Sequence, residues 1–155
     1  MAADPASFRD PAGQVHHAQG RIFRAVAKSA IDDFEFARAN PRLKKFIADG
    51  AGVDSTEVAA NDAFVPAQEG AKLYEHPRLP FISYPYEWSF SLLKRAALHH
   101  LDLQIALLPA GISLCDATAY NIQFIGRRPV FIDALSFRRY EEGEYLMGLL
   151  KNMGP

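Results

Sequence analysis

Residues 87–108 read EWSFSLLKRAALHHLDLQIALL, and Pro109-Ala110-Gly111 follows directly. Apolar residues recur every three or four positions here, which predicts a long helix that the Pro-Ala-Gly sequence ends. We expect two neighbouring apolar stripes on this helix: Trp88, Leu92, Ala96 and His99 on one, and Leu93, Ala97, Leu101, Ile105 and Leu108 on the other. Together the stripes predict one broad face that packs against the rest of the domain.

The sequence after this helix indicates a β-hairpin. Residues 121–124 (NIQF) and 129–132 (PVFI) are typical of short apolar strands, and residues 125–128 (IGRR) supply the turn between them. A hairpin of this length brings the end of its second strand back beside the start of its first. Asn121 and Asp133 are therefore expected to lie close together.

The first 80 residues are predicted to form a β-rich layer that includes a helix. Residues 7–26 indicate a hairpin whose last strand covers 21–26, and residues 72–76 indicate a further extended segment. Ser29 is the expected cap of the helix, and Asn40-Pro41 is its expected break.

These elements together predict an α+β fold, with a small N-terminal β-layer and helix followed by a long helix packed on a β-hairpin. We expect a single domain over 1–155, with a β-rich lobe over 1–80 and the helix and hairpin over 81–155. The tail over 141–153 is predicted to be a helix. Its apolar side, formed by Tyr145, Leu146, Leu149 and Leu150, favours self-association.

Charge and composition exclude several classes of function. The 155 residues carry 17 basic and 18 acidic side chains, so electrostatic binding to nucleic acid or to a membrane surface is not expected. The single cysteine, Cys115, excludes an internal disulfide and a cysteine-based zinc site. The apolar stretches are too short to span a bilayer, and the N-terminus lacks the features of a signal peptide. We therefore predict a cytoplasmic protein.

Two acids and an amide form the candidate site. Asp116 follows the long helix, Asn121 begins the hairpin and Asp133 ends it. Amide and carboxylate oxygens suit a hard cation such as Mg²⁺, and a nearby carboxylate can orient a hydroxyl in phosphoryl transfer. A structural interpretation is also open, in which the three side chains bond to nearby backbone or form one buried hydrogen-bonded network.

The stretch Asp116-Ala-Thr-Ala-Tyr-Asn121-Ile-Gln-Phe, with Pro129-Val-Phe-Ile-Asp133, resembles the catalytic and metal-binding loops of the protein-kinase-like fold. The aminoglycoside phosphotransferases are the most similar in style. The resemblance implies a reduced kinase-like arrangement in which Asp116 is the catalytic aspartate, and Asn121 and Asp133 hold the Mg²⁺ of a bound ATP. It also implies that Arg24 or Lys28 takes the place of the nucleotide-binding lysine, with Glu35 as its acidic partner.

The chain departs from that pattern in three ways. Leu114 stands where these kinases usually have the histidine that opens the catalytic loop, and no glycine-rich phosphate loop is visible. The 22 residues from 134 to 155 are too few for the large helical part of a kinase. These departures favour nucleotide binding over phosphoryl transfer.

A broader resemblance covers most of the chain. It rests on SFRDPAGQV, GRIFRAV, LPFISYPYEWSFSLLKRAAL and LCDATAYNIQF with RPVFIDALSF. These stretches are similar to the N-terminal region of a group of bacterial class I S-adenosylmethionine-dependent methyltransferases. The resemblance implies that a methyltransferase domain lies further downstream, and that this chain has no S-adenosylmethionine site.

Three functions follow as hypotheses. The leading one is an accessory kinase-like domain of a methyltransferase-family protein, which binds nucleotide and Mg²⁺ without methyltransferase activity of its own. The alternatives are a small-molecule phosphotransferase that uses ATP, and a non-catalytic scaffold or protein-interaction module. The expected partners are a C-terminal methyltransferase domain, or a second copy of the chain through the C-terminal helix.

Overall fold

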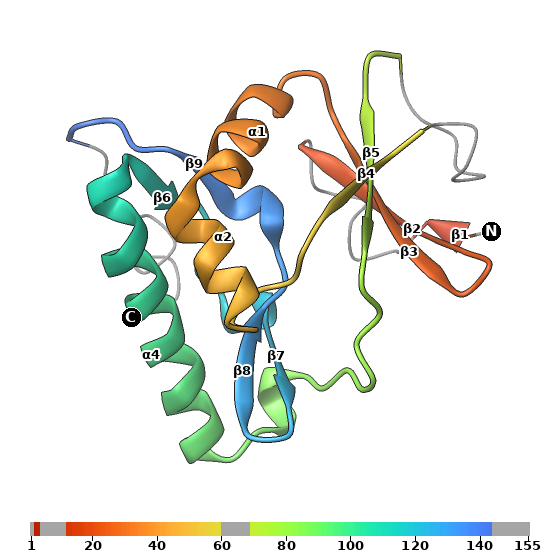
Figure 1. Ribbon diagram of the computed structural model, residues 1–155. Helices are drawn as coiled ribbons and strands as arrows, with labels where there is room; N and C mark the ends of the chain where they lie inside the picture. Colours follow the sequence, from red (N-terminus) through yellow and green to blue (C-terminus); the bar gives the residue numbers. More distant parts are fainter. Residues whose placement is uncertain (1, 4–11, 60–68, 144–155) are drawn as a thin grey trace.

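A computed structural model describes residues 2–3, 12–59 and 69–143 (Figure 1). In these residues a β-layer comes first along the chain, two short helices follow its third strand, and a long helix then lies beside two smaller pairs of strands. The predicted α+β fold class is confirmed. The predicted division into lobes over 1–80 and 81–155 stays a prediction, and the part of the predicted C-terminal helix from 144 onward lies outside the described residues.

The β-layer has the strand order β1-β2-β3-β5-β4, and each neighbouring pair is antiparallel. Its strands are β1 (Ala2–Ala3), β2 (Gly13–Ala18), β3 (Arg21–Val26), β4 (Thr56–Val58) and β5 (Lys72–His76). Gln19 and Gly20 connect β2 to β3 with positive φ angles of 50° and 75°, as a tight two-residue hairpin turn requires. The predicted strand over 21–26 and the extended segment over 72–76 are confirmed.

Helices α1 (Ile31–Ala39) and α2 (Pro41–Ala48) meet at the break that Asn40-Pro41 predicts. The side chain of Asn40 accepts a hydrogen bond of 2.9 Å from the backbone N–H of Arg42 and so caps α2. The prediction that Ser29 caps α1 is wrong. The capping position is Ala30, which has no side-chain acceptor.

The long helix α4 (Phe90–Leu107) continues into the 3-10 turn η3 (Leu108–Ala110) and stops at Gly111, whose φ of 71° is left-handed. The predicted hairpin is present as β7 (Ile122–Ile125) and β8 (Arg128–Phe131). The sequence patterns did not predict the antiparallel pair β6 (Ile112–Leu114) and β9 (Phe137–Arg139). Three more 3-10 turns are η2 (Pro85–Glu87), η4 (Ala119–Asn121) and η5 (Ala134–Ser136).

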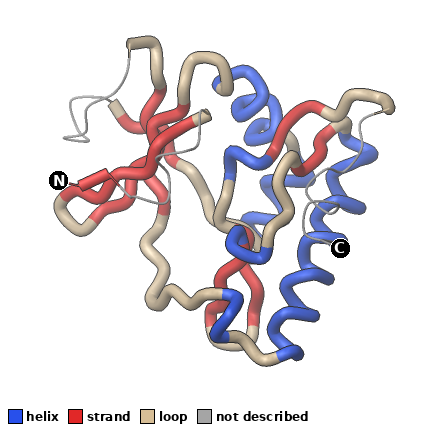
Figure 2. Tube along the Cα trace, turned by 180° about the vertical axis from the view of Figure 1, so that it is seen from behind, coloured by secondary structure: helices blue, strands red, loops and turns tan. Residues whose placement is uncertain are grey.

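The loop after α2 is hydrogen-bonded to strand β8 of the hairpin. Phe131 donates its N–H to the carbonyl of Ala51, and Val53 donates to the carbonyl of Phe131, both at 2.9 Å. The tube drawn from behind in Figure 2 shows this loop passing from the helices to the β-layer. A hydrophobic core extends from α2 across α4 to the strands, and it includes Leu43, Trp88, Leu103, Leu107, Ile112, Ile122, Phe131 and Phe137. This core includes Ile122 and Phe131, so it holds in place the two ends of the β7–β8 hairpin.

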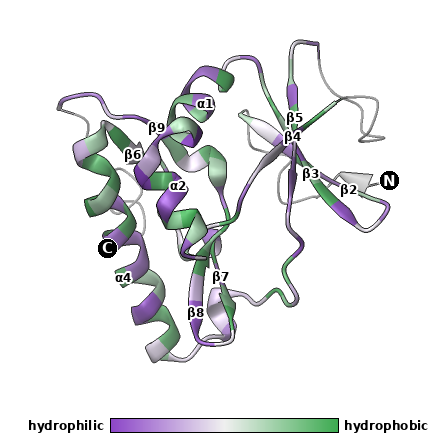
Figure 3. Cartoon of the chain, in the orientation of Figure 1, coloured by the Kyte–Doolittle hydropathy of each residue, from purple (hydrophilic) through white to green (hydrophobic). Residues whose placement is uncertain are grey.

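Only one side of α4 is buried. The buried residues are Ala96, His99, His100, Leu103, Gln104 and Leu107. In contrast Leu101, Ile105 and Leu108 are 43%, 70% and 39% exposed. The prediction of one broad buried apolar face is therefore wrong for the second stripe. Figure 3 shows apolar residues along α4, which lies at the edge of the molecule.

Candidate functional site

The β7–β8 hairpin brings Asn121 and Asp133 together, as the sequence predicts. Asn121 ends η4 just before β7, and Asp133 comes two residues after β8. The N–H of Ile132 donates to the carbonyl of Asn121 at 2.9 Å, so the two ends of the hairpin are in direct contact. The local pattern of strand, turn and strand is therefore sufficient to create this pair.

A cation from the β-layer meets Asp133. The guanidinium of Arg24, on β3, donates from Nη1 to Oδ1 of Asp133 at 2.5 Å, although 109 residues separate them in sequence. Their side chains are only 13% and 21% exposed, so solvent screens this ion pair weakly. Of the two cations considered from sequence, Arg24 is the one that the fold places at the site.

Ser136 links the other candidate residues. Its hydroxyl donates to Oδ2 of Asp133 at 2.6 Å and accepts a bond of 3.3 Å from Nδ2 of Asn121. Nδ2 of Asn121 also lies 3.3 Å from the carbonyl of Asp116, and Oδ1 of Asp116 accepts from the N–H of Thr118 at 3.2 Å. Asp116, Asn121 and Asp133 are thus parts of one hydrogen-bonded cluster with Arg24 and Ser136.

Two oxygens of this cluster have no hydrogen-bond partner among the described residues: Oδ1 of Asn121 and Oδ2 of Asp116. Because Nδ2 of Asn121 makes both amide bonds, its oxygen is left for another ligand. Together with the carboxylate of Asp133, this oxygen gives the hard donor set that Mg²⁺ prefers. Each oxygen of this carboxylate accepts one hydrogen bond, Oδ1 from Arg24 and Oδ2 from Ser136, and each keeps a second lone pair.

Glu35 does not pair with Arg24, contrary to the expectation from sequence. Its carboxylate instead accepts hydrogen bonds from the hydroxyl of Tyr74 and from Nζ of Lys72, the latter at 3.3 Å, and Arg38 lies 3.5 Å away. The Tyr74 hydrogen bond is the largest cause of the lowered pKa of Glu35. Burial and then the same bond raise the pKa of Tyr74.

Lys28 also lies away from the cluster. It follows the end of β3 by two residues and is exposed. Its aliphatic chain is close to Gly70, where an added Cβ would come within 3.2 Å of it. The structure therefore gives Lys28 no contact with Asp116, Asn121 or Asp133.

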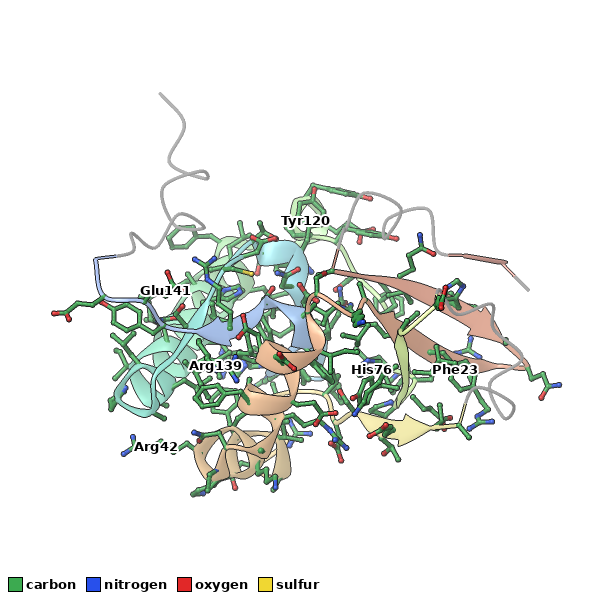
Figure 4. All side chains as sticks on the ribbon, turned by 90° about the horizontal axis from the view of Figure 1, so that it is seen from above. Phe23, Arg42, His76, Tyr120, Arg139 and Glu141 are labelled. Atoms are coloured by element: carbon green, nitrogen blue, oxygen red, sulfur yellow. The ribbon has the colours of Figure 1, made fainter. Side chains whose placement is uncertain are left out.

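His76, at the end of β5, is a buried residue that sequence reasoning missed (Figure 4). Its Nδ1 lies 3.0 Å from the carbonyl of Asp54, which accepts, so Nδ1 carries the proton and Nε2 is an acceptor. Burial lowers the pKa of His76 to about 4, and the Arg24 guanidinium contributes while the carboxylate of Asp133 opposes it. His76 is therefore neutral at pH 7.

Ser136, Lys72 and Tyr74 were also missed, although the sequence contains weak signals for them. Ser136 comes three residues after Asp133, a spacing at which a hydroxyl can return to a turn carboxylate. Lys72 and Tyr74 alternate along one strand and so share a face of it. For Lys72 and Tyr74 the spacing does not identify the partner, because Glu35 lies on another element, α1.

Within the described residues, neither a cluster of typical metal-binding side chains nor a membrane-spanning helix is present. These residues contain no group of three or more His, Cys, Asp and Glu side chains placed to hold a metal ion. Nor is any helix in these ranges both long and apolar enough to cross a membrane. The candidate Mg²⁺ ligands therefore depend on the amide of Asn121 as well as on Asp133.

Comparison with known proteins relates the chain to one part of a larger bacterial protein. No protein-family model matches the chain. The nodulation protein NoeA of Rhizobium meliloti (strain 1021) is 46% identical over 142 residues, which cover 92% of this chain. The chain spans only 29% of the length of that relative.

Proposed function

We propose that this chain is a kinase-like accessory module of a longer protein, and that it binds a nucleoside triphosphate together with Mg²⁺. In this proposal the module does not transfer methyl groups. Arg24 holds the phosphates, and Asn121 and Asp133 hold the metal ion. The partial coverage of NoeA supports the accessory role, because the matched stretch is a minor part of that protein.

The observation that carries the proposal is the contact between Arg24 and Asp133. A guanidinium binds phosphate oxygens in a two-point geometry, and a carboxylate binds the Mg²⁺ that accompanies them. Without ligand the two charges neutralise each other. A bound Mg²⁺–phosphate pair gives each of them a new partner of the correct sign.

The arrangement favours binding over phosphoryl transfer. One oxygen of Asp116 is free and could accept a hydrogen bond from the substrate hydroxyl that receives the phosphate. Its other oxygen already accepts the N–H of Thr118. Leu114 has no group that could orient Asp116 from the start of the loop. Phosphoryl transfer to a small molecule through Asp116 is therefore our second candidate function, and its test is turnover after binding has been measured.

A ligand-free structural role is the third candidate, and one observation favours it. Asp116, Asn121 and Asp133 each have an internal hydrogen-bond partner, so the cluster is stable as a link between the β-layer and the hairpin. This role predicts no nucleotide binding at any concentration that the folded chain tolerates. It also predicts that substitutions in the cluster change stability and nothing else.

The experiment is titration calorimetry of the chain with ATP, with and without Mg²⁺. We expect Mg²⁺-dependent binding that Asp133→Asn and Arg24→Ala each weaken by at least about tenfold, which corresponds to 1.4 kcal/mol. Arg21→Ala is the matched control, because Arg21 lies on the same strand and forms an ion pair with Glu75 instead. Circular dichroism checks that every variant is folded. Absence of heat at millimolar ATP from a folded sample would leave the structural role as the function of the cluster.

A further inference from the structure

A buried histidine nitrogen lies close to the candidate site and is not used by it. His76, the last residue of β5, is only 8% exposed, and its Nε2 atom has no hydrogen-bond partner among the described residues. The carbonyl of Asp54 accepts from Nδ1 at 3.0 Å, so this bond fixes the direction of the ring and leaves Nε2 as an acceptor. A buried acceptor without a donor destabilises a fold, so its persistence here calls for a partner.

The pairing of β3 with β5 makes His76 a neighbour of Arg24. Ile22 lies opposite His76 and Arg24 lies opposite Tyr74, so Arg24 and His76 are diagonal neighbours on adjacent strands. Alternate residues of a strand project to the same side, so both side chains lie on the face of the sheet that also carries Tyr74. Diagonal neighbours are about 7–8 Å apart, which is within reach of a side chain as long as arginine.

Arg24 has donors that remain unused. A guanidinium carries five N–H groups, and the contact with Oδ1 of Asp133 is the single hydrogen bond that Arg24 makes among the described residues. Burial lowers the pKa of His76 to about 4, and the guanidinium of Arg24 lowers it further while the carboxylate of Asp133 raises it. The imidazole is therefore a neutral acceptor at pH 7, and both charges of the ion pair are close enough to act on it.

The other hydroxyl donors on or beside β5 are engaged elsewhere. The hydroxyl of Tyr74 donates to Glu35, and the hydroxyl of Ser55 lies 3.3 Å from Nδ1 of the histidine and not from Nε2. Because Nε2 is also closed to solvent, its donor must come from inside the fold. Among the charged groups that act on this imidazole, Arg24 is the one that can donate.

We propose that His76 is a positioning residue for Arg24: its Nε2 accepts a guanidinium N–H when Asp133 binds Mg²⁺, and so directs the opposite edge of the guanidinium at the phosphates. This inference rests on the proposed function. A divalent cation on the carboxylate of Asp133 repels the guanidinium, which then needs a neutral acceptor. A phosphate takes two of the five N–H groups, which leaves donors for the imidazole.

The first test uses the chain without ligand and records the ¹⁵N resonance of His76 Nε2 at pH 7. Asp133→Asn weakens the hold on Arg24, and Asp133→Leu removes it. We expect the resonance to move towards that of a protonated nitrogen in both variants, because Nε2 then accepts a hydrogen bond. Adding Arg24→Met should cancel this movement. Ser55→Ala is the matched control, because Ser55 lies beside the other ring nitrogen. Circular dichroism checks that each variant is folded.

The second test is calorimetry with ATP and Mg²⁺. His76→Phe keeps an aromatic ring but removes the acceptor, and we expect the affinity to fall by about five- to tenfold, the effect of one hydrogen bond. His76→Gln supplies an acceptor oxygen and should recover most of the loss. Ser55→Ala should bind as the unchanged chain does.

The two tests separate this proposal from the proposed function. If Nε2 does not move in either Asp133 variant, or moves equally with Arg24→Met present, the proposal is overturned whatever the affinity for ATP. Unchanged affinity in His76→Phe also overturns it. If the unchanged chain binds no ATP but Nε2 moves and the movement depends on Arg24, nucleotide binding is overturned and the pairing of Arg24 with His76 is supported.

Discussion

Two charged clusters on the same face of the β-layer show how similar groups serve different purposes. Arg24 and Tyr74 lie opposite each other on β3 and β5, so their side chains project to the same side. Arg24 reaches Asp133, whereas Tyr74 reaches Glu35. We call these the Arg24 cluster and the Glu35 cluster.

The difference between the clusters lies in their partners. Glu35 on α1 accepts hydrogen bonds from Tyr74 and Lys72 on β5, and these two bonds tie α1 to the sheet. Arg38 pairs with Glu35 within α1 itself. The Arg24 cluster instead joins the β-layer to the hairpin and leaves oxygens of Asn121 and Asp116 free. A saturated cluster stabilises, whereas one with free ligand oxygens between two elements can also bind.

The largest expected effect is on stability when Asp133 is removed. Asp133→Ala leaves the guanidinium of Arg24 mostly buried without its partner, so we expect the free energy of unfolding to decrease by about 3–5 kcal/mol. Urea denaturation followed by circular dichroism measures the change. The double variant Arg24→Met with Asp133→Leu should recover most of the loss. A double variant as unstable as the single one would contradict this account.

In the Glu35 cluster, Tyr74→Phe removes one hydrogen bond to a carboxylate. We expect the free energy of unfolding to fall by about 1.5–3 kcal/mol, since a bond to a charged group is lost while the ring keeps its packing against Phe34. ATP affinity should stay unchanged in calorimetry. If it falls along with stability, the two clusters do not act separately.

Acid should destabilise the protein through two buried histidines, one in the β-layer and one in the long helix. Burial lowers the pKa of His76, on β5, and of His100, on α4, to about 4. The unfolded histidines bind a proton near pH 6.5, so the contribution is complete above that pH and is lost as pH falls towards 4. We expect a loss of about 2 kcal/mol per histidine at pH 5. His100→Gln should flatten this dependence, and an unchanged slope would argue against it.

The smallest effect distinguishes the two histidines. Asp133 raises the pKa of His76, but it is not among the groups that act on His100. Asp133→Asn should therefore lower the pKa of His76 further and leave that of His100 unchanged. NMR titration of the imidazole carbon-bound protons measures both values in one sample. A parallel shift of both would place the effect in the whole fold and not in the Arg24 cluster.

The sequence predicted much of the local structure but few long-range partners. The strands over 21–26 and 72–76, the break at Asn40 and the β7–β8 hairpin were all predicted. The pairing of β6 with β9 was missed, because three-residue strands have too few positions to show a period. For the site, hairpin geometry predicted the pair of Asn121 and Asp133 correctly. The predicted partner of Glu35 was wrong. Its partners, Lys72 and Tyr74, are set by how β5 pairs with β3, which local sequence patterns do not show.

By itself, the sequence determined the elements whose formation depends on a few neighbouring residues. Gln19-Gly20 turns the first hairpin, Pro41 starts α2, and Gly111 ends the long helix, since backbone freedom acts locally. Only the tertiary structure decided that Arg24, and not Lys28, reaches Asp133, and that one stripe of α4 is buried while the other is exposed. Both outcomes depend on which elements pack together. Periodicity shows that a helix has apolar faces, but the contacts that cover each face come from distant parts of the chain.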